Sequence, residues 1–506
     1  MSLNRNIAAN YASQAYVVGV GIAVTPLYIK YMGAESYGLI GFFTVMQALF
    51  GLLDLGLTPT IARETARYHG GGLSNQTYRQ LFRALAVIFL MLAIVGGGGI
   101  WMASDRIASS WLKFGTVSRG EVVQAVELIG LCVALRWLGG LYRGVVGGAE
   151  QLVWLSGFNA LVATLRFIAV FASMVAFGFT PQVFFLHQLA VAAIEMSGLL
   201  VRCHGLLPRR SQLTGPIGWS LAPVWPLLRF SLTIAFTSVL WIAVTQSDRL
   251  ILSGILDLKE YGYFSLAVLV AGGITMITSP VSIAITPRLA RLHVEGKETE
   301  FIAVYRGATR LVTMIAGTVA VTLAVCAEPA LWAWTGNAEL ATRAAPIMQL
   351  YALGNALLAL AAFPFYIQYA KGHLIHHIVG NVLLAVILLP AVIYAATRYG
   401  GIGAGYVWVL INFLYIAVWV AYVHGRLVPG LHVTWLRDDI GSIVLPLSLL
   451  GAVIAWFRPP LSGRLDSLVY CLVVGAVLAL TSWFVFRRQQ ARSEQRFHVA
   501  RESKGP

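Results

Sequence analysis

Apolar runs of about twenty residues, separated by short polar segments, follow one another along nearly the whole chain. A helix needs roughly 20 mainly apolar residues to cross the hydrocarbon core of a bilayer. The pattern therefore predicts an all-α integral membrane protein with about fourteen transmembrane helices. The predicted spans are 7–28, 38–60, 84–104, 121–142, 154–177, 182–202, 228–248, 261–286, 309–329, 344–369, 376–396, 402–423, 440–457 and 467–486.

Lysine and arginine residues are concentrated on one side of this predicted topology. With both termini in the cytoplasm, 24 basic residues fall in cytoplasmic segments and ten in external ones. The remaining two, Arg136 and Arg166, lie within predicted helices. Because cytoplasmic loops of membrane proteins carry an excess of basic residues, the asymmetry predicts an even number of helices and two cytoplasmic termini.

Three short motifs recur at a nearly constant separation of 224, 228 and 224 residues. The pairs are Tyr37-Gly38 with Tyr261-Gly262, Thr58–Arg63 with Thr286–Arg291, and Gly148 with Gly372. Each repeat contains six predicted helices, and an even number gives both copies the same orientation in the membrane. We therefore expect two six-helix bundles related by a pseudo-twofold axis along the membrane normal, followed by two further helices.

The repeat divides the chain into five predicted parts. They are a six-helix bundle at 1–202, a cytoplasmic linker at 203–227, a second bundle at 228–424, an extra helix pair at 440–486 and a basic cytoplasmic tail at 487–506. Two bundles related in this way can rock against each other and expose a central cavity alternately to each side of a membrane.

Composition supports a lipid environment and restricts the function. The chain is 58% hydrophobic and 11% charged, whereas soluble proteins carry roughly 25% charged residues. The excess of basic over acidic residues, 36 against 21, is spread over short loops, so we expect no nucleic-acid partner. No cysteine or acidic residue accompanies the histidine cluster at 373–377, and no phosphate-binding GxxxxGK[ST] motif occurs. We therefore expect no metal, no cofactor and no built-in ATPase.

Several motifs, taken in order and spacing, are similar to those of a known family. They are Leu53–Leu57, Asp248–Leu252 followed by Tyr261–Ala267, Lys371-Gly372 followed by Asn381, and Tyr399–Gly405. Together they resemble the polysaccharide flippases of the multidrug, oligosaccharidyl-lipid and polysaccharide exporter superfamily. The resemblance covers essentially the whole chain.

The resemblance implies a transporter, not an enzyme, in a bacterial inner membrane. Such a protein flips an undecaprenyl-diphosphate-linked oligosaccharide by alternating access, for O-antigen, capsule or exopolysaccharide synthesis, and is driven by protons or sodium. The implied partners are the lipid-linked oligosaccharide, membrane lipids, a polysaccharide polymerase and glycosyltransferases.

Charged side chains inside the predicted helices are the first candidates for a site, since a charge at the middle of a membrane helix costs roughly 2.5–3.5 kcal/mol on insertion scales. Guanidinium groups suit a diphosphate because they donate two hydrogen bonds in parallel. The candidates are Arg136 and Arg166 within the predicted spans, and Arg143 and Arg249 directly after the ends of the spans 121–142 and 228–248. The structural alternative is that these side chains reach the membrane interface, or pair with Glu127 or Glu195.

A second set of polar residues is expected to line a wetted cavity or to carry a coupling ion. The candidates are Asp54, Asp248, Glu195, Gln47 and Asn10. The alternative for the uncharged members is interhelical hydrogen bonding, worth about 0.6 kcal/mol per contact. For Glu195 the alternative is a structural partner of an arginine, and for Asp248 it is an interfacial ion pair with Arg249.

Other functions remain open at this point. An exporter of cationic drugs with the same fold would need an acidic cavity, and a flippase of a peptidoglycan-precursor lipid would share the fourteen-helix plan. A membrane glycosyltransferase or polymerase would need catalytic acids in its external loops. The loops at 29–37 and 105–120 each contain one acid, Glu35 and Asp105.

Overall fold

The computed structural model describes the backbone of residues 3–54 and 56–502, and the side chains of 9–54, 56–227, 236, 238–282 and 284–491. Within these ranges the chain is almost entirely helical. The single extended pairing described there is an isolated bridge between Lys113 and Asp257. The all-α prediction is confirmed.

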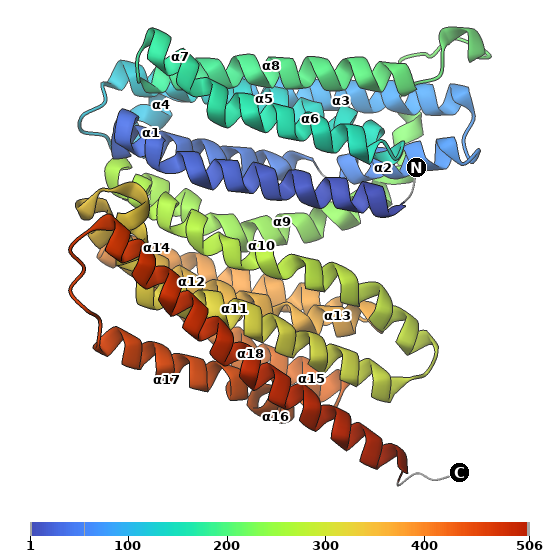
Figure 1. The fold of residues 1–506 in the computed structure, drawn as a ribbon. Coiled ribbons are helices and arrows are strands. Elements are labelled where there is room, and N and C mark those ends of the chain that lie inside the picture. The colour runs from blue at the N-terminus through green and yellow to red at the C-terminus, as the bar shows by residue number, and fades with distance from the viewer. Residues whose placement is uncertain (1–2, 55, 503–506) are drawn as a thin grey trace. The chain divides into compact units, whose positions relative to one another are not determined.

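The chain divides into two compact units, residues 1–262 and 263–506 (Figure 1). The helices of the first unit are α1 (Leu3–Leu53), α2 (Leu57–His69), α3 (Asn75–Met102), α4 (Ser104–Arg106), η1 (Ile107–Trp111), α5 (Arg119–Gly148), α6 (Leu152–Thr164), η2 (Leu165–Ala169), α7 (Val170–Phe177), α8 (Pro181–Leu206), η3 (Arg210–Gln212), η4 (Ala222–Val224) and α9 (Trp225–Ile255).

The second unit begins within α10 (Leu258–Val294). It continues with α11 (Glu298–Thr335), α12 (Ala338–Ala361), α13 (Phe363–Ala370), α14 (Ile375–Leu414), η5 (Tyr415–Val420), α15 (Ala421–Leu427), α16 (Leu431–Thr434), η6 (Trp435–Gly441), α17 (Ser442–Trp456) and α18 (Arg464–Glu502). The division at Gly262 places α9 with the first unit, whereas the repeat assigns 228–424 to the second bundle. The domain division drawn from the repeat stays a prediction, and residues 503–506 of its basic tail lie outside the described residues.

Eleven helices in the described part of the chain are long and apolar enough to cross a membrane. Two of these, Ala9–Leu53 with 45 residues and Ile375–Leu427 with 53, are about twice the length of one passage. Each is broken at a glycine whose backbone is not helical, Gly33 (φ 86°, ψ 161°) or Gly400 (φ 59°, ψ −143°). Counting these as two passages each, and adding α9, gives fourteen, the predicted number.

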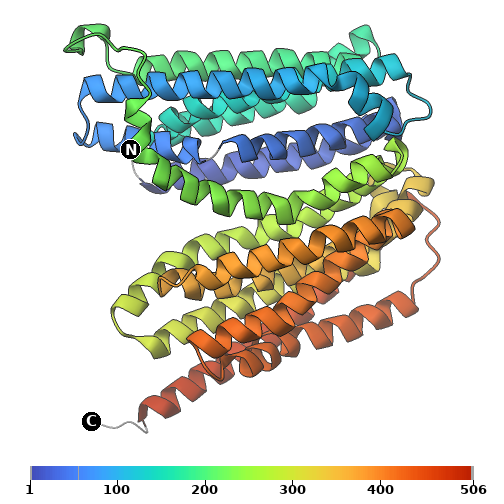
Figure 2. The same ribbon diagram turned by 180° about the vertical axis from the view of Figure 1, so that it is seen from behind.

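The break at Gly33 reverses the chain, so that α1 is a helical hairpin (Figures 1 and 2). Tyr28 of the first arm stacks edge-on against Phe184, and Phe43 of the second arm against the adjacent Phe185, with ring centroids 5.3 and 5.6 Å apart. In a straight helix Tyr28 and Phe43 would be separated by about 22 Å along the axis. Both arms therefore contact α8 near its start.

Helix starts in the first unit are capped by short polar side chains. Ser118 and Glu121 form a capping box at the start of α5, in which Ser118 Oγ accepts from the Glu121 backbone N–H and Glu121 Oε2 accepts from that of Ser118. Thr180 caps α8, whose first residue is Pro181. These caps set where α5, which carries Arg136 and Arg143, and α8, which carries their partners Gln188 and Glu195, begin.

The second predicted span is interrupted after Leu53. Gly56 is left-handed (φ 70°), and the helix resumes as α2 at Leu57. The carboxylate of Asp54 accepts from the backbone N–H of Thr58 at 3.2 Å and from its Oγ1 at 2.5 Å. Asp54 therefore caps the second half of a broken helix.

Two repeat-related glycines make a reciprocal contact in the first unit. A Cβ atom on Gly38 would overlap the carbonyl oxygen of Leu258, and one on Gly262 would overlap that of Ala34. The two contacts are related by the same 224-residue offset, as a local twofold axis requires. Only glycine allows backbones to approach so closely.

The segment 111–118 connects several helix ends at the predicted external end of the first unit. Glu35 accepts from the backbone N–H of Gly115 at 2.6 Å and of Thr116 at 2.9 Å. Lys113 O accepts from the Leu258 N–H at 2.7 Å. Asp105, the other acid of the external loops considered above, pairs with Arg119 at 2.8 Å. Both acids are thus engaged in structural contacts, which argues against the glycosyltransferase alternative.

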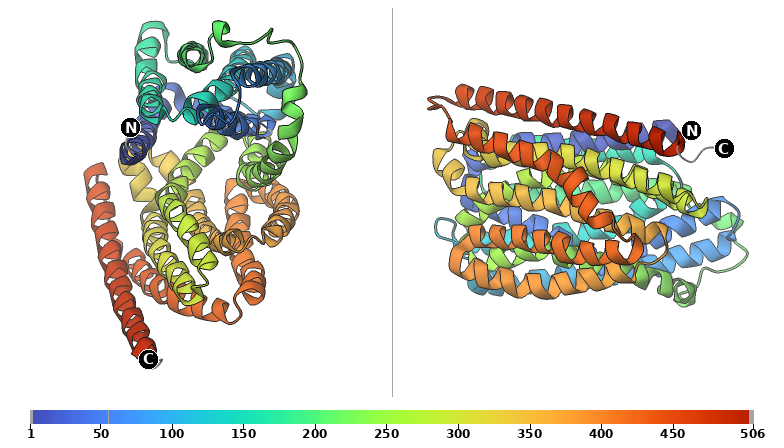
Figure 3. Two further views of the ribbon diagram at one scale, coloured as in Figure 1. Left: turned by 90° about the vertical axis from the view of Figure 1, so that its right-hand side faces the viewer. Right: turned by 90° about the horizontal axis from the view of Figure 1, so that it is seen from below.

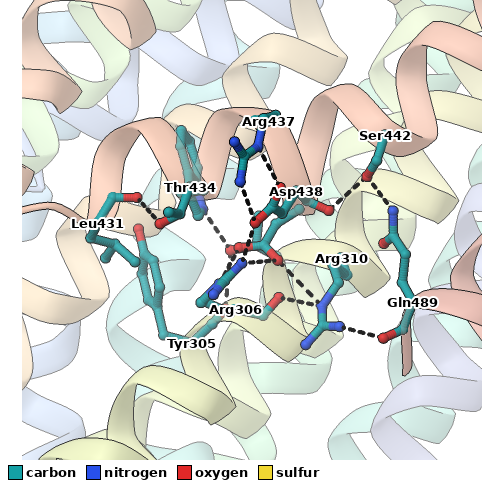
Figure 4. A network of polar contacts seen from close by, with 12 residues as sticks. Tyr305, Arg306, Arg310, Leu431, Thr434, Arg437, Asp438, Ser442 and Gln489 are labelled. Carbon is teal, nitrogen blue, oxygen red and sulfur yellow. Dashed lines mark hydrogen bonds and ion pairs between the residues drawn. The ribbon is translucent and has the colours of Figure 1, made fainter. Parts of the chain in front are cut away.

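In the second unit, α18 packs along α11 and α17 (Figure 3). Their shared core is apolar and is formed by Val321, Cys326, Ile443, Leu447, Val474 and Leu478. A network of ion pairs lies at one end of this contact (Figure 4). Arg306 Nε donates to Asp439 Oδ2 at 2.6 Å, and Arg310 Nε lies 3.4 Å from Oδ1 of the same carboxylate.

The same network ties η6 and α18 to α11. Arg306 also approaches Asp438 at 3.6 Å, and Arg310 Nη1 donates to the carbonyl oxygen of Gln489 at 3.3 Å. Asp439 is 1% exposed, and its two arginine partners, Arg306 and Arg310, are half-buried. In this network the positive charges of the arginines are neutralised by the carboxylates of Asp438 and Asp439.

Candidate functional site

Helices α5 and α8 pair two arginines with two polar residues in a regular ladder. Arg136 Nη2 donates to Gln188 Oε1 at 2.9 Å, and Arg143 Nη2 to Glu195 Oε1 at 2.6 Å. The members of each pair are 52 positions apart in the chain, and the rungs are seven residues apart on both helices. The seven-residue spacing puts both rungs on one face of each helix.

Arg136 is held in the middle of the unit by neutral groups. Its second contact is to Gln47 Oε1 of α1 at 3.1 Å, and its guanidinium lies 5.1 Å from the ring of Phe43. Arg136 is about 26 Å from the start of α5 and about 18 Å from its end, so it does not reach a membrane interface. Its Nε has no hydrogen-bond partner. The half-buried charge is therefore solvated by amide oxygens, and no described residue forms an ion pair with it.

Arg166 lies on η2, a π-helical segment between α6 and α7. Such segments leave carbonyl groups without the usual partner and are frequent at functional sites. Three consecutive carbonyl oxygens here accept from side chains: that of Leu165 from His187 Nε2 (2.9 Å), that of Arg166 from Gln188 Nε2 (2.9 Å) and that of Phe167 from Tyr28 Oη (2.9 Å). His187, Gln188 and Tyr28 thus fix the backbone that presents Arg166.

The Arg166 guanidinium makes no hydrogen bond or ion pair with any described residue. It lies 5.3 Å from the ring of Phe167, and its Nε is buried without a partner. All five of its N–H donors are left for a ligand, and three remain on Arg136. Among the described residues, neither arginine forms an ion pair with Glu127 or Glu195, and their role in substrate binding stays a prediction.

Arg143 differs because it is neutralised. Besides its ion pair with Glu195, its Nη1 donates to Asn159 Oδ1 at 2.6 Å. The second carboxylate oxygen of Glu195 has no partner. The structural alternative, an acid that pairs with an arginine, describes this pair, and its roles in substrate or ion binding stay predictions.

The remaining predicted site residues are not joined to this cluster by any contact described here. Asp54 caps α2, as described above, and Asn10 is exposed on α1. Asp248 is 3% exposed, and its Oδ1 accepts from the backbone N–H of Arg249 at 2.7 Å. The cluster therefore consists of four residues: Arg136, its two partners Gln47 and Gln188, and Arg166, whose carbonyl oxygen accepts from Gln188. The pair of Arg143 and Glu195 lies beside it.

Sequence reasoning did not select Gln188, Asn159, His187 or Tyr28 as site residues. A signal for Gln188 was present, because it lies seven residues before Glu195 on an otherwise apolar helix. No sequence signal marks the π-helical segment whose carbonyl groups His187 and Tyr28 satisfy.

These features define a multi-pass, all-α membrane protein whose first unit holds uncompensated arginines in its interior. Residues 3–293, more than half of the chain, match the family described as "Polysaccharide biosynthesis protein". The chain belongs to this family. A curated relative from Shigella flexneri, described as "Putative O-antigen transporter", is 22% identical over 297 residues, which is 58% of this chain and 68% of the relative.

Solved structures show the same fold. The lipid II flippase MurJ in an inward closed conformation superposes with a TM-score of 0.70 at 12% identity, covering 97% of this chain and all of that one. An inward-facing multidrug resistance transporter of the MATE family and MOP superfamily gives a TM-score of 0.62 at 14% identity, covering 82% of this chain and 95% of the other. At these identities the likeness concerns the fold alone.

Proposed function

We propose that the chain flips an undecaprenyl-diphosphate-linked oligosaccharide across the bacterial inner membrane, for the synthesis of O-antigen, capsule or exopolysaccharide. The observation that carries this proposal is the pair Arg136 and Arg166, two half-buried guanidinium groups that form no ion pair with an acid in the part of the chain that the structure describes. The family and the described function of the Shigella flexneri relative support the same class of transport.

The charges of Arg136 and Arg166 are stabilised only when a ligand brings opposite charge to them. An uncompensated charge within a membrane helix is unfavourable by roughly 2.5–3.5 kcal/mol, and two of them would consume much of a typical folding free energy. A diphosphate supplies the missing negative charge only while substrate is bound. The site is therefore least stable when it is empty, and this instability favours binding of the diphosphate. A diphosphate could not cross apolar protein without such partners.

Glu195 provides a route by which a coupling ion could act on the same site. It holds Arg143 through one carboxylate oxygen and leaves the other without a partner. Protonation or sodium binding at Glu195 would release Arg143 to join Arg136 and Arg166. We propose Glu195 as the coupling acid of a secondary transporter that uses alternating access, with a polysaccharide polymerase and glycosyltransferases as functional partners.

A drug exporter and a peptidoglycan-precursor flippase are the competing transport functions. The surplus of arginine over acid in the cluster disfavours a cationic substrate, since like charges repel there. A peptidoglycan precursor also carries a diphosphate, so the arginines do not distinguish the two flippase functions. Complementation does: the chain should restore polysaccharide export in a strain that lacks its polysaccharide flippase. It should not rescue a strain that has lost the peptidoglycan-precursor flippase.

The test of the proposed function is charge reversal. Arg136→Glu and Arg166→Glu should each abolish surface polysaccharide while membrane levels of the protein stay normal, whereas Arg→Lys should be milder because bidentate contact is lost but charge is kept. Arg106→Glu, on an exposed side chain, is the matched control and should export normally. Normal export by both charge-reversal variants would sink the proposal.

The proposed topology is tested separately. Reporter fusions at the C-terminus and at Ser109 should report opposite compartments, with the C-terminus cytoplasmic. The same compartment at both positions would show that the helix count is wrong by an odd number.

A further inference from the structure

The second unit contains a pocket of about 550 Å³ where three segments meet. The segments are the end of α11, the start of α12 and residues 458–461, which precede α18. The volume lies within the range of roughly 300–1,000 Å³ that is usual for ligand pockets. None of the residues used in the candidate site above lines it.

The walls of this pocket are fixed by polar contacts between the segments. Arg458 Nη1 pairs with Glu328 Oε2 at 3.0 Å, and Thr342 Oγ1 donates to Glu328 Oε1 at 3.2 Å. Next to the pocket, Arg464 Nη2 donates to the carbonyl oxygen of Ala333 at 2.9 Å and so caps the end of α11. Asn337 caps the start of α12 by accepting from the Leu340 N–H at 3.0 Å.

The lining combines flat apolar faces with a polar rim. Trp332, Pro459 and Pro460 supply ring faces, and Glu328, Arg458 and Thr342 supply hydrogen-bonding groups. Sugar rings have the same two characters, because their C–H faces are apolar and their hydroxyl edges both donate and accept. Where a carboxylate lies beside a guanidinium, the carboxylate can accept from one hydroxyl while the guanidinium donates to the next.

The charges restrict the ligand further. The pairing of Glu328 with Arg458 leaves the pocket without a net charge from these two residues, which disfavours a phosphate or a cation as the principal ligand. The polar rim disfavours a lipid tail. On the predicted topology, the loops around 336 and 460 are both external, on the side where a translocated glycan arrives.

We propose that this pocket binds one or more sugar residues of an uncharged glycan. Trp332 acts as the stacking platform, and the pair of Glu328 and Arg458 orients the hydroxyl groups. The ligand chemistry follows from the pocket alone; only its side of the membrane depends on the predicted topology.

The test measures binding of a lipid-free oligosaccharide repeat, released by mild acid from the cells' own surface polysaccharide. The full chain is placed in lipid nanodiscs, because maltoside detergents carry sugars that would compete. Saturation-transfer NMR and calorimetry should show saturable binding. Trp332→Ala should weaken it about tenfold or more, and Glu328→Gln should weaken it by a similar factor, since a charge-assisted hydrogen bond is lost.

Matched variants separate this pocket from folding defects and from the arginine cluster. Trp332→Phe keeps an aromatic face and should bind within about threefold of the parent chain. Trp456→Ala removes a tryptophan that is 86% exposed and does not line the pocket, and should change nothing. Arg136→Gln should leave sugar binding intact while blocking transport, so the two proposals fail independently. Absence of saturable binding, or equal loss in the Trp332 and Trp456 variants, would overturn the inference.

Discussion

Arg136 in the first unit and Arg306 in the second both lie on long helices, α5 and α11, and both donate hydrogen bonds to side chains of other helical segments. Arg306 and its neighbour Arg310 share the carboxylate of Asp439, whereas Arg136 contacts only the amide oxygens of Gln47 and Gln188. Amide oxygens solvate a guanidinium without cancelling its charge. The comparison separates a network that stabilises the fold from a cluster that retains its charge for a ligand.

The largest expected effect is on the stability of the second unit. Asp439→Ala leaves the half-buried Arg306 and Arg310 without their shared carboxylate, so the free energy of unfolding should fall by about 3 kcal/mol. Chemical unfolding of the purified protein measures it. Asp438→Ala is the control, because that side chain is 30% exposed and should lower stability far less. Equal effects would mean that burial does not distinguish the two acids.

A change of opposite sign is expected in the first unit. Arg166→Met removes a charge that has no partner among the described residues, so stability should rise by about 2–3 kcal/mol while export is lost. Arg143→Met is its counterpart and should lower stability, because Glu195 loses its ion pair. If Arg166→Met destabilises the protein as Arg143→Met does, the comparison between the two regions fails.

The smallest expected effect concerns the repeat. Gly38→Ala places a methyl group against the carbonyl oxygen of Leu258 and should lower the free energy of unfolding by about 1–3 kcal/mol. Gly98→Ala is the matched control, since a Cβ there meets nothing within 4 Å and alanine favours the helix. Equal free energies of unfolding for the two variants would show that the close contact between Gly38 and Leu258 does not exist.

The fold was largely predictable because transmembrane spans depend on local composition. Runs of about twenty apolar residues located the passages, including the pairs that meet at Gly33 and Gly400. The break at Asp54 was not predicted, because it depends on a left-handed glycine and on a side chain that caps the following helix.

The arginines of the candidate site could be selected from the sequence, whereas the residues that contact them could not. Arg136 and Arg166 stand out because charge is rare within apolar runs. Which neighbour each would meet depends on how helices pack, and Gln47 lies 89 positions from Arg136 in the chain. Arg143 and Arg136 look equivalent in the sequence, yet only Arg143 is paired with an acid.

The most direct test of the arginine cluster is binding of undecaprenyl diphosphate, without sugar, to the purified protein, measured by native mass spectrometry. Each lost guanidinium removes charge-assisted hydrogen bonds worth about 1.5–3 kcal/mol, so Arg136→Gln and Arg166→Gln should each weaken binding about tenfold to a hundredfold. Arg106→Gln should bind like the parent chain. If the double variant Arg136→Gln, Arg166→Gln binds as tightly as the parent chain, the two arginines are not a diphosphate site.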